Sequence, residues 1–438
     1  MKTETEETTD TFEYENNPDK TTKLDNPEIS QDIALNIENI NFFKRSHRMT
    51  KAISLLFNSS LNPNERMNKK ELMLIWYELN MVDIESITFI LPAFINLEAL
   101  YLSNNSIGVL QAQKLSECLV YLKELRVLVI ASNNIGDEGI KWISTAIKYL
   151  KNIKTLNFKL NSITQIGAKF LKLSIKNFRY LRRIELGGSD LLTKNTIGPK
   201  GAKFIGSALK ELNFVRKIDL EGNEIRDKGL SGLKPAISFN RNLKAINLSK
   251  NSITAEGISI LSNILPELKF LWRLDLSYNN LSTISHYNFF HAFKSLKKLK
   301  LLNLSGTNLN ENDLAFIFTN HSLFSSIETL CLNENNINDE GAEIISNGLE
   351  NFMSLKSITL YGNKITDDAF EMLIESFIKT NLRRVDLGHN LFTSNIIKTI
   401  KKYKDELERF QSFNLRSEIN EKLNQKLSMS RKSDILLQ

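Results

Sequence analysis

The sequence predicts an α/β solenoid, in which one strand–turn–helix unit is repeated along most of the chain. Residues 125–150 show the unit: a strand pattern at Leu128 and Ile130, a turn at Gly136, and the apolar spacing of a helix from Ile140. So short a unit cannot bury its apolar face alone, and similar units precede and follow it. A fixed period and a recurring asparagine support the same prediction.

The repeat follows the pattern Leu-x-x-Leu-x-Leu-x-x-Asn-x-Ile. Eight of the ten steps between successive starts are 28 residues, one is 34 and the last is 27. In a strand, side chains alternate, so the second and third leucines of each unit should face the core and the residues between and after them the opposite side. The eleven starts are Leu97, Leu125, Ile153, Leu181, Val215, Leu243, Leu271, Leu299, Ile327, Leu355 and Leu382.

An asparagine recurs where each unit leaves its strand. Its amide can both donate and accept hydrogen bonds, so it can pair turn backbone that would otherwise be buried without a partner. We therefore interpret the column as structural. Its members are Asn105, Asn133, Asn161, Asn223, Asn251, Asn279, Asn335, Asn363 and Asn390, and two units carry Ser189 and Thr307 instead.

These units resemble leucine-rich repeats of the ribonuclease-inhibitor type, as in LEALYLSNNSI, LKAINLSKNSITAEG and IETLCLNENNINDEG. The resemblance implies a right-handed α/β horseshoe with a parallel sheet on the concave face and helices on the convex face. It implies no single function, because that family includes inhibitors, a GTPase activator, immune sensors and ciliary scaffolds.

Charge and pattern divide the chain into four segments. Residues 1–40 hold three basic and eleven acidic side chains, although the whole chain has a net charge of +7; we expect a largely disordered acidic arm. Residues 41–96 are expected to form a helical N-terminal cap, and 97–410 the eleven repeats. Residues 411–438 are expected to form a tail or a short helix.

The long step after Leu181 contains an insertion within 187–201. Asn195, Ile197 and Gly201 restore the repeat spacing after it, so the extra residues should bulge as a loop at a rim of the solenoid. Loops on rigid scaffolds often carry function, but a neutral insertion is also well tolerated.

The concave side of the sheet is the predicted partner-binding surface. Four strands carry a basic residue two positions before an acidic one, and residues two apart on a strand face the same side. Mutual pairing for solubility is one interpretation, and a polar protein-binding surface is the other. The candidate residues, with three tyrosines on or beside this face, are Tyr101, Arg183, Glu185, Lys217, Asp219, Arg273, Asp275, Tyr278, Tyr361, Arg384 and Asp386.

The sequence shows no converging catalytic constellation. Its five histidines lack metal-ligand spacing, and Cys331 has no histidine placed to activate it. We therefore expect no enzyme, no cofactor and no metal. No apolar run is long enough to span a membrane. Nucleic acid is an improbable partner, because the concave charges are mixed and no stacking platform is evident in the sequence.

A non-catalytic scaffold that binds a protein on its concave face is the function we expect. The resemblance leaves two narrower alternatives open: an activator of a small GTPase resembling the Ran activator, and a ciliary or axonemal subunit resembling the leucine-rich-repeat member of the dynein regulatory complex. The acidic, polar N-terminus lacks a secretory signal and favours a cytoplasmic chain, with a cytoskeletal or ciliary location as the narrower alternative.

Overall fold

A single parallel sheet runs through the computed structural model, which describes residues 68–281 and 286–415. Its thirteen strands follow one another in chain order, and each pairs in parallel with the next. The strands are β1 (Glu71–Met73), β2 (Ala99–Tyr101), β3 (Val127–Val129), β4 (Thr155–Asn157), β5 (Arg183–Glu185), β6 (Lys217–Asp219), β7 (Ala245–Asn247), β8 (Arg273–Asp275), β9 (Leu301–Asn303), β10 (Thr329–Cys331), β11 (Ser357–Thr359), β12 (Arg384–Asp386) and β13 (Ser412–Asn414).

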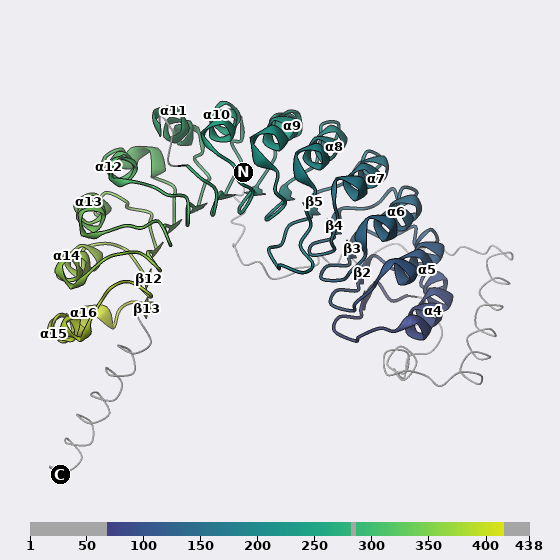
Figure 1. Cartoon of the computed structure of the whole chain (residues 1–438), viewed down its shortest axis with the longest axis horizontal. Coiled ribbons are helices and arrows are strands. Elements are labelled where there is room, and N and C mark those ends of the chain that lie inside the picture. The colour runs from purple at the N-terminus through teal and green to yellow at the C-terminus, as the bar shows by residue number, and fades with distance from the viewer. Residues whose placement is uncertain (1–67, 282–285, 416–438) are drawn as a thin grey trace, which may run out of the picture. The chain divides into compact units, whose positions relative to one another are not determined.

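Helices connect successive strands. They follow the outer side of the arc that the described repeats form, and the strands follow the inner side (Figure 1). The α-helices are α4 (Met81–Ile90), α5 (Val109–Leu119), α6 (Gly136–Ile147), α7 (Gln165–Ile175), α8 (Gly198–Leu209), α9 (Arg226–Phe239), α10 (Ala255–Ile264), α11 (His286–His291), α12 (Glu311–Thr319), α13 (Asp339–Leu349), α14 (Asp367–Ile378), α15 (Ile397–Lys402) and α16 (Lys404–Leu407). Short 3-10 helices are η1 (Leu91–Ala93), η2 (Leu265–Glu267), η3 (Ala292–Ser295), η4 (His321–Phe324) and η5 (Ser394–Ile396).

The core lies between the strand and helix layers. In the unit that begins at Leu125, the side chains of Leu125, Leu128, Ile130 and Ile140 are all fully buried. Adjacent strands pair with equivalent residues opposite each other, as Leu128 with Leu156. Each unit therefore stacks its apolar positions on those of its neighbours, which is how a solenoid builds one continuous core from short repeats.

The strand–helix plan extends beyond the eleven predicted units at both ends. The described part of the expected helical cap contains β1, which pairs with β2 and buries Leu72 against Leu100. The same part also contains α4 and η1, so the segment expected as a helical cap combines one strand with helices in its described residues. At the other end, β13 pairs with β12 and places a strand at the start of the expected tail. The acidic arm 1–40 and residues 416–438 lie outside the described residues.

Candidate functional site

The asparagine column forms a buried ladder beneath the ends of the strands. Asn251 is typical: its Oδ1 accepts from the backbone N–H of Asn223 and of Ile225, at 3.0 and 3.2 Å. Its Nδ2 donates to the carbonyls of Leu220 and Ser249, at 2.8 and 2.9 Å. Apart from Asn161, whose Oδ1 has no partner among the described residues, each such asparagine thus completes the turn of the repeat before it and joins the two repeats.

The insertion does not interrupt this ladder. Asn195 takes the place of Ser189, because its Oδ1 accepts from the N–H of Asn161 at 3.0 Å and its Nδ2 donates to Leu186 O at 2.8 Å. Thr307 fills the other gap with a hydroxyl that donates to Leu304 O at 2.6 Å. The repeat with the extra residues therefore keeps an asparagine in the ladder.

A second polar column closes the strand ends on the concave side. The last strand residue accepts a hydrogen bond from the backbone N–H two positions later in six repeats. These residues are Asn157, Asp219, Asn247, Asp275, Asn303 and Asp386. Three predicted partner-binding residues are thus backbone caps. Asp219 and Asp275 are 3% and 5% exposed, so they do not project from the sheet as expected.

The concave charges largely pair with one another. Lys159 contacts Asp219 at 2.6 Å, and Lys217 contacts Glu185 at 2.9 Å. Burial alone would lower the pKa of Lys159, but the charge and hydrogen bond of Asp219 raise it above its ordinary value. Arg273 reaches Asp275 at 3.6 Å. These contacts favour mutual pairing as the main role of the mixed charges. By contrast, Arg183 and Arg384 are exposed and have no ion pair among the described residues.

The three predicted tyrosines do not form one group. Tyr101 is 7% exposed on β2. Tyr278 is 41% exposed, and its hydroxyl donates to Glu334 at 3.0 Å. The ring of Tyr278 lies over Gly306, where an added Cβ would come within 2.6 Å of a ring carbon, while the ammonium of Lys250 lies 5.1 Å from the ring centre. This cluster holds an exposed aromatic ring in one position across several repeats.

The other half-exposed tyrosine lies farther along the array. Tyr361 packs against the ring of His389 with centroids 4.7 Å apart, and Gly388 leaves room for it.

The pKa of Tyr278 is raised by burial and by its bond to Glu334, so this hydroxyl keeps its proton and remains a donor. Tyr278 therefore lacks the environment of a catalytic acid or base near neutral pH.

The insertion presents two leucines to solvent. Leu191 and Leu192 are 87% and 90% exposed. The carboxylate of Asp190 accepts from the N–H of Leu192 and of Thr193, at 2.8 and 3.1 Å, and so fixes the turn that carries them. Lys194 ties the loop to the next repeat through Glu224, at 3.0 Å. Hydrogen bonds and an ion pair thus fix a loop with an apolar tip. The spacing of the sequence located the loop but did not show that its leucines are exposed.

One column of residues was not identified from the sequence. The residue directly before each strand, here called the pre-strand column, donates its backbone N–H to the carbonyl of its predecessor in the previous repeat, at 2.7–2.9 Å throughout. Reading this position across the aligned repeats would have revealed its mainly basic character. The column is Lys70, Glu98, Arg126, Lys154, Arg182, Arg216, Lys244, Trp272, Lys300, Glu328, Lys356, Arg383 and Gln411.

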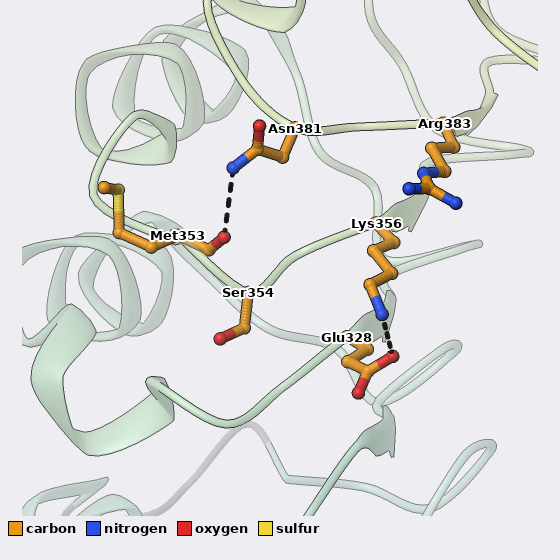
Figure 2. A pocket seen from close by; sticks show the side chains of 6 residues that line it. All are labelled: Glu328, Met353, Ser354, Lys356, Asn381 and Arg383. Atoms are coloured by element: carbon orange, nitrogen blue, oxygen red, sulfur yellow. Dashed lines mark hydrogen bonds and ion pairs between the residues drawn. The ribbon is translucent and has the colours of Figure 1, made fainter. Parts of the chain in front are cut away.

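A pocket of about 310 Å³ opens on this edge of the sheet. Figure 2 shows the pre-strand residues Glu328, Lys356 and Arg383 along one wall and Met353 and Asn381 along the other. Lys356 pairs with Glu328 at 2.7 Å, and Asn381 donates to Met353 O at 3.3 Å. A second hollow, of about 390 Å³, lies between α6 and α7. Both are open hollows without a converging set of reactive groups.

The cysteines are unreactive by environment. Burial raises the pKa of Cys118 to about 12, and burial also raises the pKa of Cys331. Neither thiol therefore has the conditions that activate a thiolate nucleophile. Within the described residues, no three histidine, cysteine or acidic side chains are grouped to hold a metal, and no helix is long and apolar enough to cross a membrane.

Comparison with known proteins identifies the repeat. The family model described as leucine-rich repeat matches residues 123–144, 211–234, 239–262 and 325–346. No curated protein matches. Among solved structures, an internalin from Listeria monocytogenes is similar at 20% identity with a TM-score of 0.48, over 83% of this chain and 92% of that one. The matched repeats and the continuous parallel sheet together make this chain an α/β leucine-rich-repeat horseshoe.

Proposed function

We propose that this leucine-rich-repeat chain is a non-catalytic scaffold that binds a partner protein along the concave side of its sheet. The observation that carries the proposal is the cluster around Tyr278. Its ring is held by Glu334, Lys250 and Gly306 before any partner arrives. Tyrosine and arginine are enriched among residues that dominate binding energy, and a fixed side chain loses little entropy on binding.

The rigidity of the whole surface supports the same proposal. Thirteen strands in register, joined by buried asparagines, leave little of the backbone to be ordered when a partner binds. The exposed guanidinium groups of Arg183 on β5 and Arg384 on β12 belong to this sheet and are available for a partner's carboxylates. We also propose the ribonuclease-inhibitor type for the repeats, because paired strands lie 28 residues apart and α-helices connect them.

Capture of partners from a native extract tests the proposal. The full chain and the Tyr278→Ala variant serve as bait, and captured proteins are identified by mass spectrometry. Trp142→Ala is the matched control, since it removes an aromatic ring of similar exposure, 38% against 41%, from helix α6 on the convex side. We expect a stoichiometric partner that Tyr278→Ala loses and Trp142→Ala keeps.

The reverse dependence would place the working surface on the helices, and the absence of any stoichiometric protein partner would overturn the scaffold proposal. The identity of the captured protein also separates the narrower functions. A small GTPase would favour a role like that of the Ran activator. Tubulin or dynein subunits would favour a ciliary or cytoskeletal role in the cytoplasm.

A further inference from the structure

The middle of the pre-strand column carries four successive positive charges without an ion pair among the described residues. Lys154, Arg182, Arg216 and Lys244 follow one another in successive repeats, joined by backbone hydrogen bonds of 2.7 Å. None of the four forms an ion pair with any described residue. We call these four residues the cationic run. Arg182 and Arg216 are exposed, and Lys154 and Lys244 are half-buried.

Both ends of the column are arranged differently. On one side, Glu98 lies between Lys70 and Arg126, at 3.5 and 2.5 Å. On the other side, Glu328 lies between Lys300 and Lys356, at 3.0 and 2.7 Å. At each end an acid in the column thus pairs with the two basic residues beside it, and the cationic run lies between these two paired groups.

This arrangement is unfavourable for the folded chain alone. Neighbouring strands lie about 4.8 Å apart, and like charges directly opposite each other on adjacent strands are destabilising. Burial and the charges of Arg126 and Arg182 lower the pKa of Lys154. Helix dipoles do not explain the charges, because dipole effects fade within the last turn and α7 ends at Ile175, well before Arg182.

Exposed aromatic rings accompany the cationic run. Tyr180 and Phe214 precede Arg182 and Arg216 by two residues and are 50% and 48% exposed. Their ring centroids are 6.2 Å apart, so the two form one apolar contact beside the charges. Phe239, the last residue of α9, is 53% exposed and precedes Lys244 by five residues. The same edge of the sheet therefore offers positive charge and aromatic surface together.

We infer that the cationic run binds a short acidic segment of the partner protein, in extended form, with an apolar side chain of that segment on the Tyr180–Phe214 pair. The inference rests on the proposed scaffold function and adds the site and the chemistry of the partner. The four cations span roughly 14 Å, the length of about four extended residues.

The finite length of the cationic run is what favours a peptide over a nucleic acid. A nucleic acid carries negative charge along its whole length and would continue onto Glu98 or Glu328 at the ends of the column. A protein segment can confine its acidic residues to the cationic run. Arginine forks bind carboxylates with two parallel hydrogen bonds, and Arg182 and Arg216 can present such forks side by side.

Direct binding of a probe tests the inference. The probe is a fluorescent acidic peptide of about ten residues that contains phenylalanine, measured by anisotropy against the full chain at two salt concentrations. The variant combines Lys154→Gln, Arg182→Gln and Arg216→Gln. The control combines Lys169→Gln, Lys203→Gln and Lys234→Gln, which remove the same charge from exposed positions on α7, α8 and α9.

We expect the cationic-run variant to weaken peptide binding at least tenfold and to reduce its salt dependence, and the control to change affinity less than threefold. The melting temperature of the variant should stay the same or rise, because repulsion is removed. A marked fall would show that the four cations stabilise the fold and would overturn the inference.

Two further outcomes decide against it. Equal loss in variant and control would mean a diffuse charge effect. Tighter binding of a single-stranded RNA of equal charge than of the peptide would assign the edge to nucleic acid. In the capture experiment, a partner retained by the cationic-run variant would refute this inference and leave the scaffold function intact. A wild-type chain that captures nothing would refute the scaffold function on which the inference rests.

Discussion

Replacing Asn251 with alanine tests whether the buried ladder holds the repeats together. Alanine removes the only hydrogen-bond acceptor for the backbone N–H groups of Asn223 and Ile225, both of which are buried. The two carbonyls that Asn251 contacts keep other donors: Asn223 Nδ2 for Leu220, at 3.2 Å, and Gly222 N–H for the other. The cost therefore comes mainly from two orphaned N–H groups, at about 1–3 kcal/mol each before relaxation.

We accordingly expect Asn251→Ala to lower the free energy of unfolding by about 2–4 kcal/mol. The assay is urea unfolding followed by circular dichroism. Because long repeat arrays do not always unfold in one step, hydrogen exchange at the two orphaned amides provides a local measurement, and both should exchange faster. The control, Asn263→Ala, removes an exposed asparagine from α10 and should change stability by less than about 0.5 kcal/mol.

An equal effect of the two substitutions would refute this reasoning. So would unchanged exchange protection at Asn223 and Ile225 in the Asn251→Ala chain. In either case solvent would replace the hydrogen bonds that Asn251 provides to the turn of the preceding repeat, and the asparagine would not stabilise that turn.

Three further predictions concern charged and ionisable groups. Asp219→Ala should destabilise by about 2 kcal/mol in urea unfolding, since it leaves Lys159 without its partner, and a loss below about 0.5 kcal/mol would contradict this. Cys331 should react with iodoacetamide at least about tenfold more slowly in the folded chain than in denaturant, because burial raises its pKa; equal rates would contradict this. The hydrogen bond from Lys356 lowers the pKa of Glu328. The stability that this pair contributes is therefore present above the ordinary pKa of 4.5 and is lost as the pH falls through the lowered pKa. In an NMR titration, Lys356→Met should raise the pKa of Glu328, and no rise would refute the pairing.

Periodic features of the fold were predictable from the sequence, and deviations from the period were not. The strand and helix positions follow from the spacing of the leucines. The strand β1 escaped because Lys69 and Tyr77 stand where the pattern requires leucine and asparagine, and its pairing with β2 depends on backbone contacts that no side-chain pattern records. The same holds for β13, where Phe410 replaces the leading leucine.

The candidate site was predicted less well than the fold. Strand alternation assigns Asp219 to the concave side, and that assignment holds for its position on β6. Alternation says nothing about the backbone N–H of Glu221, to which Asp219 turns back, nor about Lys159 two repeats earlier. Whether a polar side chain projects or caps depends on such local contacts. The cationic run was not predicted, because strand alternation assigns a face only to residues within the strands, and these four residues lie directly before them.

The ladder also gives the array a direction. In most repeats the asparagine oxygen serves the turn of the repeat before it, so such a repeat depends on its successor for these hydrogen bonds. Tyr77 fits this rule, because in the first described repeat it donates its backbone N–H to Asn105 Oδ1, at 2.8 Å. Removing repeats from the C-terminal end exposes an incomplete turn at the new end, whereas removal from the N-terminal end leaves only a spare amide. Shortening such a protein is therefore not symmetric, and the last repeat retained after a C-terminal cut should fray before the first one retained after an N-terminal cut.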